Sequence, residues 1–391
     1  MGIKRIVPFE KKTYKLLSMS EKVLVIGGAG FIGSHTVDAL LKEGMDVVIL
    51  DNLRDRIHRG EIPYYLNPKA QLIIGDIRDP AVLSSSLQDV SYIYDFAAYQ
   101  DYMTDFSAFF STNAVGTALL YELILEKEIS VKKIIIASSQ FVQGEGIYTD
   151  SNGNLFYPKS RLDKDLKKGF WDFFNDKDEK LDWQWTTEDY SQPTNAYSMS
   201  KFTQEMIGMN LSRQYDIPTV ILRYSIVQGS RQSLYNTYSG ACRIFCLHYY
   251  NDIPPVIYED GMMCRDFVNI NDVVNANIIV LNNDKANGQI FNIGGGKAYT
   301  VIEFAEEVAK CFNKTDIRPI IPGEYRLGDT RHACSDISKM KKFGWEPNQS
   351  VRDSILDYIE YLHRNEIPSG ILSETIRKMR SSGVIKKVDF R

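Results

Sequence analysis

Three side chains have the types and spacing of a proton-transfer centre. Tyr197 and Lys201 lie four residues apart in a stretch with helical character, so their side chains should share one face of a helix. An ammonium beside a phenol stabilises the phenolate and lowers the tyrosine pKa, which makes a base usable near neutral pH. Ser139 follows a β-branched run and offers a hydroxyl to the same oxygen. Because a Tyr/Lys pair also arises by chance on exposed helices, the elements that would position these residues decide its meaning.

A glycine-rich segment, GGAGFIG at 27–33, lies between a strand-like run at 22–27 and a helix-like run at 32–43. Glycines without a Cβ let a pyrophosphate approach the helix N-terminus, whose unpaired N–H groups and dipole favour anions. Asp51 ends a second strand, 46–51, at the position where a carboxylate accepts hydrogen bonds from a ribose diol and repels a 2′-phosphate. The pattern predicts a dinucleotide site that prefers NAD to NADP.

From residue 20 onward, short β-branched runs alternate with helix-like stretches, which is typical of a parallel sheet covered by helices on both faces. Strands are predicted at 22–27, 46–51, 71–75, 92–96, 133–138 and 219–224. Helices are predicted at 32–43, 108–126 and 196–215. Ligands bind at the carboxyl ends of such strands, so Ser139, Tyr197 and Lys201 should converge there. The predicted class is α/β, a Rossmann-type doubly wound parallel sheet with a smaller C-terminal substrate-binding lobe.

These patterns divide the chain into four parts. They are an N-terminal extension (1–20), an NAD-binding Rossmann domain (21–224), a mainly substrate-binding lobe (225–364) and a basic C-terminal tail (365–391). A polar, aromatic-rich insertion at 145–193 has too many charges to be core. Parts of the lobe such as 266–295 are predicted to return to the Rossmann domain. The tail is predicted to be a surface arm.

The composition argues against several other classes of protein. With 46 basic and 50 acidic side chains the net charge is −4, so no global positive field favours nucleic acid as a partner. No stretch approaches 18 apolar residues and the N-terminus lacks a signal-peptide core, which predicts a soluble, cytoplasmic protein without a membrane partner. The five cysteines and five histidines form no Cys-x-x-Cys or His-x-x-x-His pair, so neither a metal site nor a disulfide framework is expected.

The spacing Gly-x-x-Gly-x-x-Gly resembles that of the extended short-chain dehydrogenase/reductase family, and further motifs match the family in order over nearly all of 20–364. They are Asp76-Ile77, Ala97-Ala98, Asn113 in NAVGT, Ser139 and Tyr197-x-x-x-Lys201. The resemblance implies bound NAD, held by Gly27, Gly30, Phe31, Ile32, Gly33, Asp51, Asn52, Asp76, Ile77, Ala97, Ala98, Asn113, Ser138, Tyr197 and Lys201. It also implies that Tyr197 exchanges the proton of a sugar hydroxyl, that Ser139 hydrogen-bonds that oxygen, and that Lys201 tunes Tyr197 and holds the nicotinamide ribose.

Within that family the chain is similar to the nucleotide-sugar epimerases of the dTDP-L-rhamnose 4-epimerase-like group, which are related to UDP-glucose 4-epimerase. The similarity is carried by LFYPKSR, TTEDYSQPTNAY, GSRQSLYNTYSGACRIF, EDGMMCRDFVNINDVVNAN and YRLGDTRHACSDIS. It implies a nucleotide-diphosphate hexose, epimerised at C4 through a transient 4-keto sugar, and a homodimer packed through helices at 108–126 and 196–215. The substrate-binding positions are Arg231, Arg265, Arg326 and Asp329, and guanidinium forks suit phosphate geometry.

Differences from the family pattern separate the alternatives. Related 4,6-dehydratases carry Asp-Glu after the catalytic serine, whereas this chain has Gln140 and Phe141, which cannot exchange a proton as a carboxyl does. Epimerisation is therefore favoured over a dehydratase or a net oxidoreductase of the same family, and over a non-catalytic NAD-binding regulator. Gln143, Ile226 and Gln228 replace family Tyr, Asn and Tyr residues, so the sugar and the epimerised carbon stay open.

Overall fold

The β-branched runs predicted as strands form one central sheet. The computed structural model describes residues 21–101, 104–236, 240–367 and 370–389. Its parallel strands are hydrogen-bonded in the order β12-β9-β5-β4-β1-β2-β3. Their bounds are β1 Lys22–Ile26, β2 Asp46–Asp51, β3 Gln71–Ile74, β4 Tyr92–Asp95, β5 Lys133–Ser139, β9 Thr219–Tyr224 and β12 Gln289–Ile293. The doubly wound α/β class is confirmed, and each predicted strand lies within a residue of its observed bounds.

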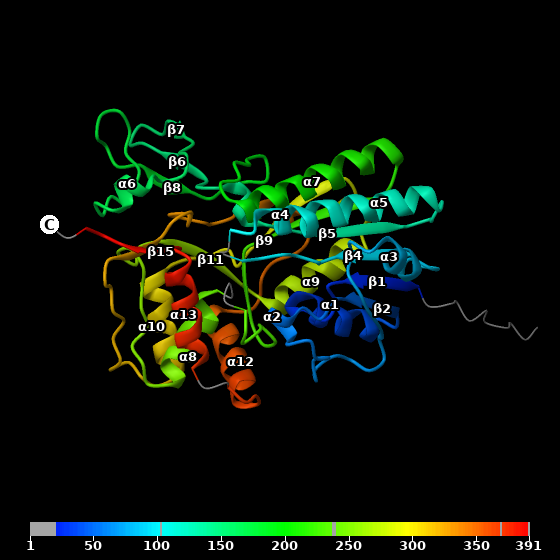
Figure 1. Cartoon of the computed structure of the whole chain (residues 1–391). Helices are drawn as coiled ribbons and strands as arrows, with labels where there is room; N and C mark the ends of the chain where they lie inside the picture. Colours follow the sequence, from blue (N-terminus) through cyan, green and yellow to red (C-terminus); the bar gives the residue numbers. More distant parts are fainter. Residues whose placement is uncertain (1–20, 102–103, 237–239, 368–369, 390–391) are drawn as a thin grey trace, which may run out of the picture.

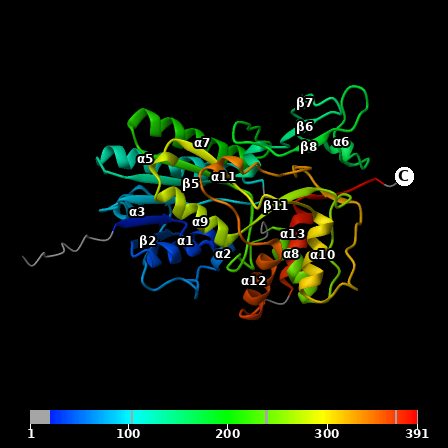
Figure 2. The ribbon, with the colours of Figure 1, turned by 180° about the vertical axis from the view of Figure 1, so that it is seen from behind.

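Alternate residues of the strands supply two separate hydrophobic cores. Along β1, Val23 and Val25 face one side of the sheet, and Leu24 and Ile26 face the other. The first side is covered mainly by α1 (Phe31–Lys42) and α9 (Ile270–Leu281), with α11 (Ser338–Lys342). The second is covered by α3 (Pro80–Ser86), α5 (Gly116–Glu126) and α7 (Ala196–Tyr215). Figures 1 and 2 show α5 and α7 on one side of the sheet and α1 and α9 on the other.

One apolar helix is longer than the sequence analysis anticipated. The helix α4 (Phe106–Phe110), a π-helical turn (Ser111–Val115) and α5 follow one another without a break. By length and composition alone, this run could cross a membrane, although no stretch of the sequence approaches 18 consecutive apolar residues. Its inner face supplies Leu120 and Ile124 to the core of the sheet, and half of its most apolar window is buried. Packing against the sheet therefore explains its apolar character.

A second lobe lies beyond the carboxyl ends of the sheet strands. Its helices are α8 (Ala241–Tyr250), α10 (Val301–Cys311) and α12 (Val351–His363). Its small sheet, in the order β10-β11-β13, comprises Ile226–Gln228, Cys264–Asn269 and Ala298–Thr300. Phe245 and Phe304 belong to a third core between these elements. Of the segment 266–295 predicted to return to the Rossmann domain, α9 and β12 do so, whereas β11 stays in the sheet of the lobe.

The insertion forms a small sheet of its own. In it β6 (Ile147–Thr149) lies between β7 (Leu155–Phe156) and β8 (Asp182–Gln184), and the short helix α6 (Asp163–Leu166) lies nearby (Figure 1). Trp183 stacks on His332 of the lobe, with ring centroids 5.8 Å apart. Arg161 donates to the buried carboxylate of Glu259 at 2.8 Å. These contacts fasten the insertion to the lobe.

The C-terminal stretch differs from the surface arm that the sequence predicted. The helix α13 (Ile371–Ser381) packs beside α8, and Leu372 and Met379 are buried. The strand β15 (Ile385–Lys387) pairs antiparallel with β14 (Glu324–Arg326), and Figure 1 shows both tail elements against the lobe. The tail packs against the lobe because α13 has an apolar stripe at helical spacing, formed by Leu372, Ile376 and Met379. The basic composition of the tail makes this stripe hard to recognise in the sequence.

Candidate active site

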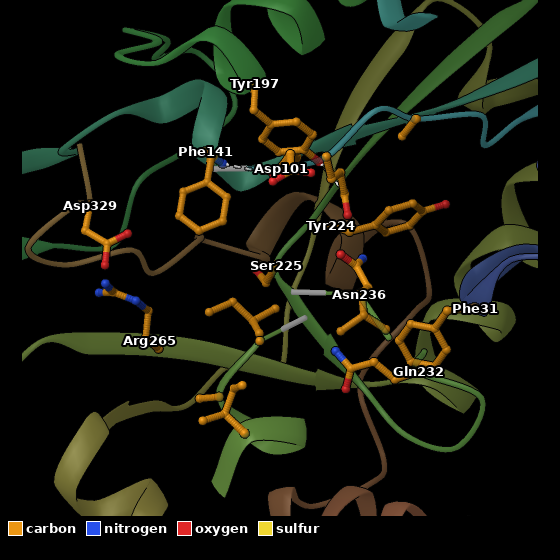
Figure 3. A pocket seen from close by; sticks show the side chains of 18 of the residues that line it. Phe31, Asp101, Phe141, Tyr197, Tyr224, Ser225, Gln232, Asn236, Arg265 and Asp329 are labelled. Atoms are coloured by element: carbon orange, nitrogen blue, oxygen red, sulfur yellow. Dashed lines mark hydrogen bonds between the residues drawn. The ribbon is translucent and has the colours of Figure 1, made fainter. Parts of the chain in front are cut away.

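A cavity of about 570 Å³ lies between the carboxyl ends of the sheet strands and the lobe. Its glycine end is formed by the turn before α1 and is lined by Gly27, Gly30, Phe31 and Gly33. Its arginine end is formed by the lobe and is lined by Arg265, Arg326 and Asp329. The three predicted catalytic residues, Ser139, Tyr197 and Lys201, also line it. Figure 3 shows Tyr197 between Phe31 on one side and Arg265 with Asp329 on the other.

The turn between β1 and α1 leaves room for a phosphate group. Gly27 has a φ of +76°, and a Cβ on it would lie 2.9 Å from the backbone nitrogen of Ala97. A Cβ on Gly33 would lie 2.2 Å from the carbonyl oxygen of Gly27. Gly30 is the N-cap of α1 and has no side chain to accept from the first N–H groups of the helix, so these donors can bind an anion. The turn therefore fits the pyrophosphate of NAD.

Asp51 supports this turn from the end of β2. Its carboxylate accepts a hydrogen bond from the backbone N–H of Ala29 at 3.0 Å. Beside it, Asn52 donates to Asp76 at 3.0 Å, and Arg78 pairs with Asp76 at 2.8 Å. The hydrogen bond from Arg78 lowers the pKa of Asp76 to about 2. These residues gather at the ends of β2 and β3, outside the described cavity lining, and the contacts of Asp51, Asn52 and Asp76 with NAD stay predictions.

The other residues assigned to the dinucleotide divide into two groups. Ile32, Ala98 and Ser138 line the cavity. Ile77 and Ala97 belong instead to the hydrophobic core beneath the edge of the sheet. The backbone of Ala97 nevertheless bounds the glycine turn, because its nitrogen is the atom that a Cβ on Gly27 would meet.

Asn113 is fully buried in the π-helical turn and makes a structural link. Its Oδ1 accepts from the backbone N–H of Tyr99 at 2.7 Å, and its Nδ2 donates to Ser200 of α7 at 2.9 Å. It thereby joins the loop after β4 to α7, the helix that carries Tyr197. In this structure Asn113 positions that helix and does not line the cavity.

The proton-transfer centre is built where α7 begins. Asn195 and Ser198 form a capping box that starts the helix immediately before Tyr197. The Tyr197 hydroxyl accepts a hydrogen bond from Gln100 Nε2 at 2.7 Å and is also hydrogen-bonded to Ser139. Burial raises the pKa of Tyr197, and the hydrogen bonds with Gln100 and Ser139 oppose that rise. The phenol therefore holds its proton at neutral pH in this state.

Lys201 lies one helical turn after Tyr197. Its Nζ donates to the carbonyl oxygen of Ala137 at 2.7 Å and to Gln204 at 2.8 Å, and Gln204 donates in turn to the buried carboxylate of Asp95. Burial lowers the pKa of Lys201 to about 8, while the charge of Asp95 opposes that change. The lysine charge was expected to lower the pKa of Tyr197, whereas in this structure burial raises it and the opposing effects come from Gln100 and Ser139.

A buried ion pair fixes α7 against the sheet. The two carboxylate oxygens of Glu205 accept from Arg223 of β9 at 2.8 Å, and Ser138 of β5 donates to the same carboxylate. Both charged side chains are almost fully buried. Because Tyr197 and Lys201 are on the same helix, this ion pair helps to set their position relative to the strand ends.

At the arginine end, the guanidinium groups of Arg265 and Arg326 are both held in place by other protein groups. Arg265 donates to main-chain carbonyl oxygens at 2.8 to 3.0 Å, which orient the cation without neutralising it. Arg326 pairs with Asp329 at 2.7 Å and lies over the ring of Tyr258, 5.0 Å from its centroid. Phe141, which stands where dehydratases carry an acid, points into the cavity between Tyr197 and this end (Figure 3).

Arg231, the fourth predicted substrate ligand, is not brought to the described cavity lining. It forms an ion pair with Asp38 of α1 at 2.7 Å, and its guanidinium lies 5.2 Å from the ring centroid of Tyr65. The residue has a φ of +65°, and the two residues that follow it, Gln232 and Ser233, line the cavity instead. The loop that carries Arg231 thus reaches the cavity, but its turn directs the Arg231 side chain towards Asp38 of the Rossmann domain.

Sequence reasoning missed several lining residues. Gln100 and Asp101 follow β4 at the edge where ligand contacts are expected, but nothing local distinguishes them from other loop residues. Ile376 and Met379 come from the C-terminal helix, and their signal was the apolar stripe along an otherwise basic segment. Both pairs reach the cavity through packing between segments that are distant in sequence.

The doubly wound sheet, the glycine turn and the adjoining cavity define a dinucleotide-binding α/β protein with a second, ligand-facing lobe. The model of the NAD dependent epimerase/dehydratase family matches residues 23–161 and 173–294. The chain therefore belongs to this family. The interval between the two matched segments falls inside the insertion.

Individual relatives agree with that assignment. The chain is 33% identical to dTDP-L-rhamnose 4-epimerase of Burkholderia thailandensis, over 86% of this chain and 93% of the relative. Its structure resembles UDP-glucose 4-epimerase of Thermotoga maritima with UDP-glucose, with a TM-score of 0.71 and 28% identity over 88% of this chain and 99% of the other. It also resembles UDP-glucuronic acid 4-epimerase of Bacillus cereus in complex with UDP-glucuronic acid and NAD, with a TM-score of 0.70, 26% identity and the same coverage. The predicted family and its dependence on NAD are confirmed.

Proposed function

We propose that this chain is an NAD-dependent epimerase of a nucleotide-diphosphate hexose and that it acts at C4. The observation that carries the proposal is the single cavity that joins the glycine end, the Tyr197 hydroxyl and the arginine end. A nucleotide sugar whose diphosphate lies at Arg265 and Arg326 can extend its hexose towards Tyr197. Relatives named as 4-epimerases of dTDP- and UDP-linked sugars support the same class of activity here.

The side chains of the cavity would handle the proton, since NAD, when bound, supplies a reversible hydride acceptor. Tyr197 removes the proton of the C4 hydroxyl as that carbon is oxidised and returns it when the carbon is reduced on its other face. Ser139 and Gln100, which already bond the phenolic oxygen, keep it aimed into the cavity. Lys201 supplies a buried positive charge on the same helix, which favours the ionised phenol during the reaction.

The residues after Ser139 favour epimerisation over elimination. Gln140 is buried and is not among the described residues that line the cavity, and Ser335 donates to its side-chain oxygen at 3.4 Å. Phe141 lines the cavity with an apolar ring. Loss of water from a hexose requires a group that delivers a proton to the leaving hydroxyl, and neither side chain can do this.

The proposal is tested by incubating the purified protein with dTDP-, UDP-, GDP- and CDP-hexoses and following the sugar protons by NMR in deuterated water. We expect interconversion of two C4 epimers without net NADH and without deuterium at carbon. Net NADH would indicate an oxidoreductase, a 4-keto-6-deoxy product a dehydratase, and deuterium at C3 or C5 carbon-acid chemistry at a neighbouring centre. Each of these results would overturn the proposal.

The substitution Tyr197→Phe tests the assignment of the base. It keeps the ring in its buried site and removes the hydroxyl, so turnover should fall by about 10² to 10⁴, the usual contribution of a positioned acid or base. NAD content should be unchanged because the glycine turn is intact, and it can be read by absorbance after denaturation. Unchanged turnover would remove Tyr197 from the mechanism.

We also propose that the protein is a cytoplasmic homodimer. All five cysteines are free thiols, which suits a reducing compartment. The outward sides of the 106–126 helix and of α7 carry exposed Val115 and Met206, which supports an interface between two copies through these helices.

A further inference from the structure

The C-terminal helix α13 reaches the cavity from the side of the arginine end. Ile376 and Met379 line the cavity together with Arg326 and Leu327. The backbone N–H of Leu327 donates to the carbonyl oxygen of Val384, just beyond α13, at 3.3 Å. The tail therefore lies directly against the strand that carries Arg326.

Several contacts fasten the tail at this position. In the β14–β15 pairing Arg326 is the register partner of Ile385, and Arg380 pairs with Glu324 at 2.8 Å. At the far end Lys386 pairs with Asp163 of the insertion at 3.0 Å. The segment is thus attached to the lobe on one side and to the insertion on the other.

We propose that the segment 371–389 forms the nucleoside wall of the substrate site, with Ile376 and Met379 against the ribose and base of the nucleotide sugar. This inference rests on the proposed function. With the hexose at Tyr197 and the diphosphate at Arg265 and Arg326, the nucleoside lies beyond the diphosphate, which is where α13 stands. An unbranched methionine adapts to ring surfaces, so this wall tolerates more than one pyrimidine base.

A double variant tests the wall directly. Ile376→Ala with Met379→Ala removes the two lining side chains, and Ser373→Ala is the matched control because Ser373 is exposed on the same helix. Calorimetry with UDP and with dTDP should show about tenfold weaker binding for the double variant and no change for the control. NAD content and kcat at saturating sugar nucleotide should be retained, so the loss should appear in KM.

A second measurement reports on the tail without relying on turnover. Hydrogen exchange of the backbone amides in 371–389 is followed in the NAD-loaded protein with and without UDP or dTDP. We expect the nucleoside diphosphate to slow exchange in this segment, and we expect the double variant to show that protection only at about tenfold higher ligand concentration.

The outcomes separate this inference from the proposed function. If the wild-type protein binds neither UDP nor dTDP, and no other nucleoside diphosphate of the panel, the proposed function and the wall both fail. If it binds one of them and the double variant binds it equally well, with unchanged exchange in 371–389, the wall is wrong while the proposed function stands. Weaker binding by the double variant with an unaffected Ser373→Ala control supports the wall.

Discussion

Burial raises the pKa of Tyr197, so little of the phenol is ionised and able to act as a base unless its neighbours lower that pKa. Two neighbours act in that direction in the structure, because hydrogen bonds with Gln100 and Ser139 oppose the effect of burial. Ser139 was expected from the sequence, whereas Gln100 was not. Its amide donates to the phenolic oxygen and so stabilises the ionised form more than the neutral one.

Replacing Gln100 by Leu should therefore move the pH dependence of the reaction. Loss of the donor raises the pKa of Tyr197 further, so the acid limb of the kcat profile shifts to higher pH. At pH 7 kcat should fall about tenfold, roughly the contribution of one hydrogen bond. Gln184→Leu, at an exposed position of the insertion, is the control and should leave the profile unchanged. A lower plateau with an unmoved acid limb would show that Gln100 shapes the cavity without tuning the phenol.

Individual residues also show where sequence reasoning reaches its limit. The triad Ser139, Tyr197 and Lys201 could be placed together because strand ends and helix faces follow from local patterns. Arg231 could not, since its direction is set by one backbone angle and by an ion pair with Asp38, far away in the sequence. Gln100 likewise acquires its role from a partner in a distant segment.

At the scale of elements, the active site depends on how firmly α7 is attached to the sheet. The Glu205–Arg223 pair and the hydrogen bond from Ser138 join α7 to β9 and β5, and all three side chains are buried. Such a pair is a weak source of net stability compared with apolar side chains, but breaking it is costly because one buried charge is left without its partner. Its effect is to fix the orientation of the helix.

Glu205→Ala should destabilise the fold by about 3 to 5 kcal/mol, because it leaves Arg223 buried and unpaired. Urea denaturation followed by circular dichroism measures the change in free energy of unfolding. Glu360→Ala is the control, since Glu360 pairs with Arg364 on an exposed helix surface and exposed pairs contribute little. Equal effects of the two substitutions would contradict the role given to the buried pair.

The elements that could be read from the sequence are those with local signals. The strands of the sheet and α7 have strong β-branched or helical patterns, and the glycine turn has a fixed spacing. The return of β12 to the central sheet agrees with the prediction for 266–295. The pairing of β15 with β14 differs, because it joins two short segments far apart in the sequence and no local pattern encodes it. For the same reason the tail was expected on the surface although it lines the cavity.

At the scale of the whole molecule, three units surround one cavity. The Rossmann domain supplies the glycine end and Tyr197, the lobe supplies Arg265 and Arg326, and the tail supplies Met379. The insertion does not line the cavity in the described structure, but it buries Arg161 against the lobe and holds the tail through Asp163. The walls of the cavity are thus held together by contacts between the Rossmann domain, the lobe, the insertion and the tail.

One surface, which borders the cavity at Phe106, has the character of an interface. The adjacent outer faces of the 106–126 helix and α7 expose large apolar side chains, including Phe106 and Val115 on the first and Met206 on the second. Their exposed fractions are 58%, 57% and 50%, and large apolar side chains exposed on two adjacent helices are typical of an interaction surface. Two copies related by a twofold axis could bury these faces against each other as a four-helix arrangement.

We therefore expect a native mass of twice 44.7 kDa in analytical ultracentrifugation at micromolar concentration. Val115→Glu combined with Met206→Glu should shift the protein to monomers, because association would bury four unpaired carboxylates, two from each copy. Leu155→Glu, at an equally exposed apolar position of the insertion, is the control and should leave the mass unchanged. A wild-type protein that sediments as a monomer would contradict the dimer, and a dimer insensitive to the double substitution would place the interface elsewhere. Packing between the two copies would help to hold α7, which carries Tyr197 and Lys201. The monomeric variant should therefore also lose activity.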